Sequence, residues 1–395
     1  MLFSILIGIA AAGIYFLKGL FIKAKFVLSG GKAEIDKDRH GYVIFSDSRR
    51  YWNIFKPVCD EMERRGIETE YWTCSADDPA LRENYQNIHC SFIGEGNKAF
   101  AKLNMVKADI VFSTTPGLDV YQWKRSRDAK YYVHCLHAAT DASMYRMFGL
   151  DFYDAVLLSG QYQADQVRKL EKLREIPAKE LEIVGLPFMD VMKERLEKAL
   201  PVPAHERTVL LAPSWGQSAI FSRYGGRIIT ELLKTGYHII VRPHPQSYTS
   251  EKALLESIMK EFPASDQLEW NRDNDNFEVL RRSDILISDF SGVIYDFCLV
   301  FDRPVIYADT SFNNGPYDAS WLNEEPWTFS LLPRVGCELN EENIPRLKEL
   351  IDDCIENPRF GQGRAEAREE AWAHIGEAAG RTVDYLVRKR KELVT

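Results

Sequence analysis

One stretch, residues 284–297, limits the fold of this chain more than any other. It reads Asp-Ile-Leu-Ile-Ser-Asp-Phe-Ser-Gly-Val-Ile-Tyr-Asp-Phe, an apolar run of strand length followed by apolar residues at helical spacing. The small and polar residues of the connection are Ser288, Asp289, Ser291 and Gly292. A buried strand that leads into a helix presents free backbone N–H groups, which bind anions. Asp296 follows about one turn later, within reach of a sugar or polyol hydroxyl. The stretch therefore predicts a site for a nucleotide diphosphate.

A second segment, residues 237–246, predicts a strand that ends in a turn fixed by two prolines. Its sequence is Tyr-His-Ile-Ile-Val-Arg-Pro-His-Pro-Gln. The turn presents Arg242 and His244 at the carboxyl end of the strand, where α/β sheets bind ligands. A guanidinium and an imidazole beside phosphate oxygens would stabilise a leaving nucleotide. The alternative is a turn whose histidine only caps a local backbone group.

The two segments together resemble the C-terminal signature of the CDP-glycerol glycerophosphotransferases, the teichoic-acid primases and polymerases of the GT-B class. The resemblance runs through residues 288–297 and the Asp-Arg-Pro-Val-Ile sequence at 302–306. The family has a second Ser where this chain has Gly292, which leaves one hydroxyl fewer for the phosphates. The resemblance implies that His244 lies at the diphosphate. It also implies that Ser214 or Trp215, in an Ala-Pro-Ser-Trp-Gly loop after an earlier strand, lines the donor pocket. A tryptophan that only packs at the edge of the domain is the alternative.

A motif in the first half of the chain supplies the candidate base. Residues 133–141, Val-His-Cys-Leu-His-Ala-Ala-Thr-Asp, follow a predicted strand where the family carries a His-Gly-Thr-Pro motif with the general base. The resemblance places this role on His137, with His134 as the reserve candidate for the base and as a candidate substrate-binding residue. Imidazole suits the task because its pKa lies near working pH. A structural role in the core is the alternative for His134. Asp141 is a candidate to orient the base or to bind the acceptor.

The composition excludes several function classes. A net charge of −8 over 395 residues gives no basic footprint for a nucleic-acid partner. The seven cysteines form no Cys-x-x-Cys pair, so the sequence predicts neither a disulfide framework nor a zinc site. Neither a Gly-x-x-x-x-Gly-Lys loop nor a Gly-x-Gly-x-x-Gly fingerprint is present, so neither a nucleoside-triphosphate loop nor a dinucleotide cofactor is expected. We expect no cofactor and no obligatory metal.

The N-terminus differs from the rest of the chain. Residues 2–17 are apolar apart from Ser4, and the lysines Lys18, Lys23 and Lys25 follow. The uninterrupted run is short for a bilayer of about 30 Å, but Lys18 could snorkel and extend it. The basic residues lie on the carboxyl side of the run, which predicts an uncleaved anchor with the catalytic part in the cytoplasm. A helix lying in the membrane interface is the alternative.

Strand and helix patterns alternate along the remainder, which indicates an α/β fold with parallel sheets. We expect two facing, doubly wound Rossmann-like domains of the GT-B type behind an N-terminal membrane helix. The predicted boundaries are 1–28 for the anchor, 38–200 for the acceptor-side domain, 201–375 for the nucleotide-donor domain and 376–395 for a C-terminal helix. The resemblance further implies that this last helix packs back on the first domain.

The sequence thus predicts a membrane-associated enzyme that moves glycerol phosphate, or a related polyol phosphate, from CDP-glycerol to a hydroxyl of a lipid-linked glycan or cell-envelope polymer. CMP would be released at the cytoplasmic membrane. Two alternatives stay open. One is a GT-B glycosyltransferase or epimerase that uses a nucleotide sugar such as UDP-GlcNAc. The other is a non-enzymatic, membrane-tethered scaffold for envelope assembly.

Overall fold

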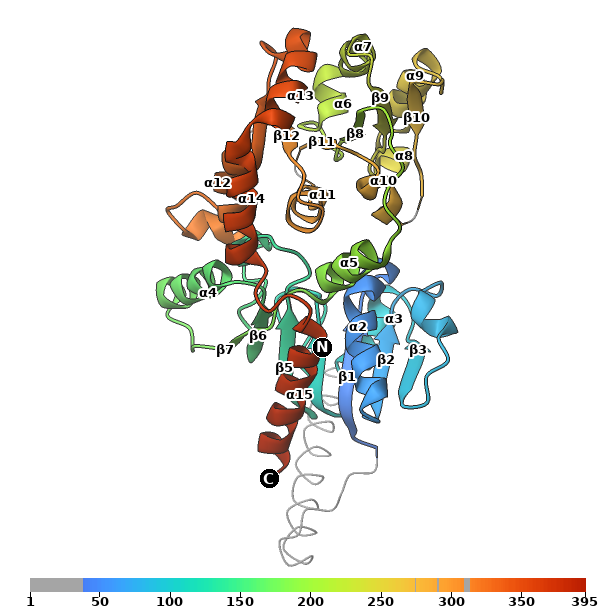
Figure 1. Cartoon of the computed structure of the whole chain (residues 1–395). Helices are drawn as coiled ribbons and strands as arrows, with labels where there is room; N and C mark the ends of the chain where they lie inside the picture. Colours follow the sequence, from blue (N-terminus) through green and yellow to red (C-terminus); the bar gives the residue numbers. More distant parts are fainter. Residues whose placement is uncertain (1–37, 274, 290, 309–312) are drawn as a thin grey trace, which may run out of the picture. The chain divides into compact units, whose positions relative to one another are not determined.

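Two parallel β-sheets organise the chain (Figure 1). The structure is a computed structural model that describes residues 38–273, 275–289, 291–308 and 313–395. The first sheet has the order β3-β2-β1-β4-β5-β6-β7, and the second has the order β10-β9-β8-β11-β12-β13. We call the two sheets with their helices the first lobe and the second lobe. Both orders start at a central strand, run outward and then reverse, which is the doubly wound arrangement.

The strands and helices have the following bounds. The first sheet contains β1 (His40–Ser46), β2 (Thr69–Thr73), β3 (Ile88–Phe92), β4 (Ala108–Ser113), β5 (Ala129–Cys135), β6 (Ala155–Leu158) and β7 (Glu180–Ile183). The second contains β8 (Thr208–Ala212), β9 (His238–Val241), β10 (Leu268–Trp270), β11 (Ile285–Ser288), β12 (Val305–Ala308) and β13 (Gly336–Leu339). The helices are α2 (Trp52–Arg64), α3 (Gly96–Leu103), α4 (Gln161–Arg174), α5 (Pro187–Lys198), α6 (Ile220–Tyr224), α7 (Arg227–Lys234), α8 (Ser247–Ser250), α9 (Lys252–Glu261), α10 (Phe277–Arg281), α11 (Val293–Tyr295), α12 (Trp327–Val335), α13 (Leu347–Glu356), α14 (Pro358–Ala371) and α15 (Ala378–Val394). Short 3-10 turns lie at Arg49–Tyr51, Pro79–Arg82, Ala142–Met144, Asp318–Trp321 and Ile344–Arg346, and a π-helical turn at Asp296–Val300 extends α11.

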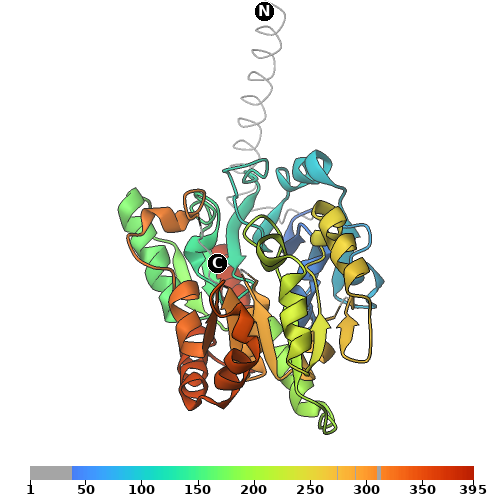
Figure 2. The same ribbon diagram turned by 90° about the horizontal axis from the view of Figure 1, so that it is seen from above.

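Helices cover both faces of the second sheet (Figure 2). In β11, Ile285 and Ile287 face a cluster that includes α7, α9 and α13, while Leu286 faces α5, α12 and α14. Successive side chains of a strand point to opposite faces, so a strand covered on both sides is apolar throughout. Each such side chain contributes roughly 1.5–3 kcal/mol by burial. This explains why the strand candidates of the sequence are continuous apolar runs.

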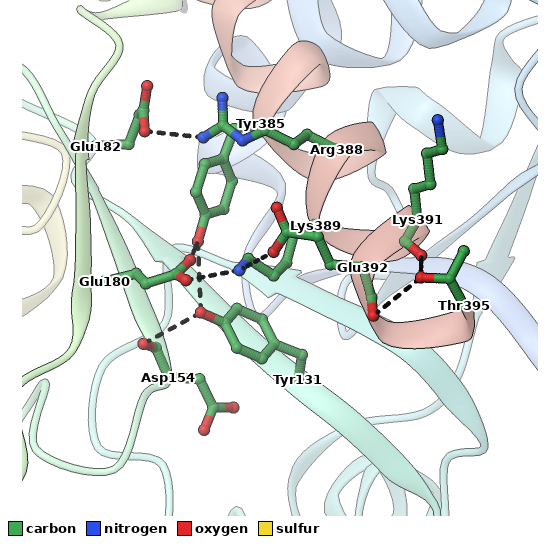
Figure 3. Close-up of polar contacts among 10 residues, drawn as sticks. All are labelled: Tyr131, Asp154, Glu180, Glu182, Tyr385, Arg388, Lys389, Lys391, Glu392 and Thr395. Carbon is green, nitrogen blue, oxygen red and sulfur yellow. Dashed lines mark hydrogen bonds and ion pairs between the residues drawn. The ribbon is translucent and has the colours of Figure 1, made fainter.

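The last helix, α15, packs against α2 and β4 of the first lobe, as the family resemblance implies. Figure 3 shows its polar anchors. Tyr385 Oη and Lys389 Nζ both donate to the carboxylate of Glu180 on β7, each at 2.6 Å, and Arg388 pairs with Glu182 at 2.9 Å. The chain reaches this position after α14, which belongs to the core of the second lobe.

Two parallel-sheet α/β lobes confirm the coarse fold prediction. No helix in the described part of the chain is long and apolar enough to cross a membrane. The expected anchor at residues 1–28 lies outside the described residues. The predicted domain boundaries stay predictions, although the chain passes from the first sheet to the second between β7 and β8.

Candidate active site

The two sheets each have a switch point, where the strand order reverses and ligands of α/β proteins bind. In the first lobe it lies between β1 and β4, and in the second between β8 and β11. Among the predicted site residues, His137, Ser214, His244, Ser291 and Gly292 follow these strands or the neighbouring β5 and β9. Asp47, Arg50 and Thr114 follow them as well.

His137 lies in the loop after β5, half-buried. Its Nδ1 is 3.1 Å from Thr114 Oγ1 and 3.3 Å from Tyr145 Oη, while Nε2 has no hydrogen-bond partner among the described residues. Burial, followed by the charge of Arg50, lowers the pKa of His137 to about 4. The ring is therefore neutral near neutral pH. If Nδ1 donates its proton to one of the two hydroxyls, the lone pair of Nε2 is available to a substrate.

His134 is fully buried on β5, which corrects the prediction that it contacts substrate. Its Nε2 is 3.1 Å from Tyr145 Oη, so the phenol lies between the two histidines. Burial lowers the pKa of His134 to about 3 and raises the pKa of Tyr145 well above its usual value. A neutral phenol can donate to His134 and accept from His137, so His134 acts on the site only through Tyr145.

Two residues of the 284–297 stretch form hydrogen bonds within the second lobe. The hydroxyl of Ser288 is fully buried and donates to the carbonyl of Ala212 on the next strand at 2.6 Å. Asp289 accepts from the backbone N–H groups of Ser214 at 2.7 Å and Ile220 at 2.9 Å. Ser288 is thus not a substrate ligand, and the carboxylate of Asp289 holds the loop after β8. The three hydrogen bonds join residues 69 to 76 positions apart in the sequence.

Ser291 and Gly292 line a cavity of about 650 Å³. Its walls also include Thr140, Tyr307, Thr328 and Glu338, with Asp289 at the edge of β11. Gly292 has ordinary helical φ and ψ, and a Cβ built on it would meet no heavy atom within 4 Å. The family's second serine would therefore fit here. Thr140 comes from the loop that carries His137, so the base loop and the phosphate loop meet at one cavity.

His244 follows β9 and is half-buried beside Trp215. Its Nδ1 accepts the N–H of Gln246 at 3.1 Å, so the neutral ring carries its proton on Nε2, which has no partner among the described residues. Burial and then the charge of Arg50 lower the pKa of His244, against Asp289 and Glu251, which raise it. The imidazole is thus fixed as an N–H donor.

Arg242 and Asp296 lie away from the cavity. The guanidinium of Arg242 donates to Asn271 and to the carbonyl of Asp273, so these hydrogen bonds hold it against the loop after β10. Asp296 starts the π-helical turn and is not among the residues that line the cavity. Burial raises the pKa of Asp296 to about 7. Their predicted contact with the donor therefore needs a ligand that extends beyond the cavity.

Asp141 joins the lobes and does not orient the base, which corrects that expectation. Its carboxylate accepts from the backbone N–H groups of Trp327 at 2.8 Å and Thr328 at 2.7 Å, at the start of α12. A carboxylate at this end of a helix satisfies free N–H groups and complements the helix dipole. Nearby, Arg174 of α4 forms an ion pair with the buried Asp318 of the second lobe.

Comparison with known proteins gives one family match. Residues 136–318 match the family model for CDP-glycerol:poly(glycerophosphate) glycerophosphotransferase. This match, over just under half of the chain, supports the resemblance to the glycerophosphotransferases that the sequence showed. The matched range covers the cavity loops at Thr140 and Ser291 as well as His244. The chain is therefore a transferase of the glycerophosphotransferase type, as predicted. A search of curated proteins gave no match.

Solved structures show how widely the fold of this glycerophosphotransferase is shared. A variant of the wall teichoic acid polymerase TagF soaked with CDPG has 14% identity and a TM-score of 0.57, and the match covers 97% of this chain and 98% of that one. S. aureus MnaA with UDP has 13% identity and a TM-score of 0.61, covering 90% and 98%. The UDP-GlcNAc 2-epimerase of Methanocaldococcus jannaschii has 13% identity and a TM-score of 0.56, covering 89% and 99%. At these identities the likeness establishes the fold and not the donor.

Sequence reasoning missed several residues of the site. Thr114 and Tyr145 hold the base, and Arg50 acts electrostatically on both imidazoles. Thr114 directly follows a predicted strand, which is a signal that could have identified it. Within the described residues no group of three His, Cys, Asp or Glu side chains is placed to hold a metal ion.

Proposed function

We propose that this glycerophosphotransferase moves glycerol phosphate, or a related polyol phosphate, from CDP-glycerol to an acceptor hydroxyl and releases CMP. One observation carries the proposal: the cavity at Ser291 and Gly292 also touches the loop of the candidate base, at Thr140. A diphosphate that leaves this cavity toward the imidazoles would bring its phosphorus atoms between the two lobes.

The Nε2 atoms of His137 and His244 take the two proton-related roles in the reaction. The acceptor hydroxyl attacks the phosphorus next to glycerol, and its proton passes to Nε2 of His137. A new P–O bond to the acceptor forms as the P–O bond to CMP breaks. The Nε2–H of His244 donates to the diphosphate and stabilises charge on the leaving nucleotide, together with the backbone N–H and hydroxyl at Ser291 and Gly292.

Catalysis by fixed donors fits the chemistry of phosphoryl transfer, in which positioning and electrostatics do most of the work. The proposal assigns no metal ligand and no cofactor to the protein's own side chains. Turnover measured after treatment with EDTA tests whether a divalent cation also bridges the diphosphate.

The acceptor and the membrane belong to the same proposal. The acceptor hydroxyl belongs to a lipid-linked glycan or an envelope polymer. Residues 1–28 anchor the enzyme at the cytoplasmic face of the membrane. The supporting observation is the apolar N-terminal sequence with its basic carboxyl flank. Sedimentation with lipid vesicles, for the full chain and for a chain lacking residues 2–28, tests the anchor. Equal binding of both proteins would contradict it.

The decisive experiment is a product assay with the full chain, CDP-glycerol and a membrane fraction as acceptor source. Release of CMP by the wild-type protein and its loss in His137→Asn support the proposal. UDP released from UDP-GlcNAc, with no CMP from CDP-glycerol, would support the nucleotide-sugar reading instead. The family match favours either enzyme over a scaffold.

A further inference from the structure

Two neighbouring arginines follow β1, and their surroundings differ. Arg49 forms an ion pair with Asp77 on the surface of the first lobe. Arg50 has no carboxylate within ion-pair distance among the described residues. Its guanidinium carbon lies 4.8 Å from the centre of the Tyr51 ring, and one nitrogen donates to Tyr51 Oη at 3.0 Å. An arginine that stacks on a phenol and lacks an acidic partner has donors to spare for a ligand.

Arg50 lies at the candidate active site. The ring of Tyr51, on which it lies, is 5.1 Å from the ring of His137 and meets it edge-on. The charge of Arg50 lowers the pKa of His137 in the first lobe and of His244 in the second. It also acts on Asp47, at the end of the same strand, although burial dominates there and raises the pKa of that carboxyl. A single cation therefore faces groups from both lobes.

The local charges favour an anion beside this cation. Both imidazoles are neutral near neutral pH, and Asp47 is not within ion-pair distance of Arg50. We propose that Arg50 binds the diphosphate of the nucleotide donor at the phosphoryl group that is transferred, between His137 and His244. The proposal rests on the proposed function for the identity of the donor, but the ligand chemistry, a diphosphate, does not depend on the base or the polyol.

The binding has a consequence for the base. Burial is the larger cause of the low pKa of His137, and the charge of Arg50 is the smaller one. A bound anion offsets the charge of Arg50, so the pKa of His137 rises above about 4 when the donor is bound. A neutral imidazole with a higher pKa is a stronger base at working pH. The donor would thus improve the base that activates the acceptor.

The test compares Arg50→Gln with the matched control Arg49→Gln in the full chain. Calorimetry with inorganic pyrophosphate should show affinity about 10- to 100-fold lower in Arg50→Gln, as expected for one charge-assisted contact, and nearly unchanged in Arg49→Gln. Arg50→Lys should give an intermediate value because it keeps the charge but not the planar donor set. NMR titration should show higher pKa values for His137 and His244 in Arg50→Gln, which a merely structural role would not produce.

Each outcome decides the point. Equal pyrophosphate affinity in the Arg50→Gln and Arg49→Gln variants overturns the inference, and so does a wild-type protein that binds no pyrophosphate. Pyrophosphate binding that depends on Arg50, in a wild-type protein that releases no CMP from CDP-glycerol, leaves the inference standing and rejects the proposed donor.

Discussion

Replacing Asp141 by alanine tests a buried contact between the lobes. The carboxylate is 2% exposed and accepts four hydrogen bonds, from the backbone N–H groups of Trp327 and Thr328, the Thr328 hydroxyl and the Gln166 amide. Alanine leaves all four donors without their acceptor. Thr328 and Gln166 are themselves buried, so water cannot replace the carboxylate without opening the structure.

The magnitude follows from these contacts. Loss of an N-terminal helix cap costs about 1 kcal/mol, and each further buried donor left unpaired costs about 1–3 kcal/mol. Partial rearrangement of the side chains recovers some of this sum. We expect the free energy of unfolding to fall by about 3–5 kcal/mol, the range seen when one partner of a buried charged pair is removed.

The assay is urea denaturation followed by tryptophan fluorescence, with donor affinity measured in parallel by calorimetry. The matched control is Asp78→Ala, since Asp78 is also fully buried and caps Ala80 at 3.0 Å, but wholly within the first lobe. Both variants should lose stability. Only Asp141→Ala should also weaken CDP-glycerol binding, because Thr140 and Thr328 on either side of the carboxylate line the cavity. If Asp141→Ala lowers the free energy of unfolding by less than about 1 kcal/mol, Asp141 does not stabilise the start of α12 as described.

Three further predictions address the base, the phosphate loop and the buried histidine. His137→Asn should lower kcat for CMP release by about 10²–10⁴-fold with donor affinity nearly unchanged, and a parallel loss of affinity would argue against proton transfer. Gly292→Ser should fold normally, because its Cβ meets no heavy atom within 4 Å, and should bind donor at least as tightly; a clear drop in Tm would contradict the described loop. The pKa of His134 is about 3 in the folded protein and about 6.5 when unfolded, so the unfolded state binds the extra proton and the free energy of unfolding falls by about 2 kcal/mol from pH 6.5 to pH 5. Urea denaturation of His134→Gln at both pH values should lack this part of the decrease.

The sequence predicted the central strands well, since buried parallel strands are continuous apolar runs. The strands β3, β10 and β13 have no such continuous apolar run in the sequence. In the edge strand β3 most side chains are exposed, so it needs no apolar run. Strand β10 has only three residues, which is too short to form a clear pattern. Helix α5 begins at Pro187, because proline suits the first helical position.

The site was predicted less completely than the fold, for a physical reason. Motif residues can serve tertiary contacts that the sequence does not display, as Ser288 and Asp289 do when they join β11 to β8 and its loop. Asp141 pairs with N–H groups 186 and 187 positions away, a distance that local pattern cannot bridge. Arg50 resembled an ordinary surface charge until the fold placed it beside His137.

The two imidazoles lead to one last prediction. Each has a pKa lowered by burial and by Arg50, and in the part of the chain that the structure describes neither Nε2 has a hydrogen-bond partner. A dianionic donor bound between them would offset the charge of Arg50 and favour the protonated imidazoles, so the pKa values must rise and protons must be taken up on binding. Calorimetry of CDP-glycerol binding at pH 6, in buffers of different ionisation enthalpy, measures this uptake. We expect uptake in the wild-type protein and less in His244→Gln. A binding enthalpy that is independent of the buffer would show that the donor's phosphates do not lie beside these rings.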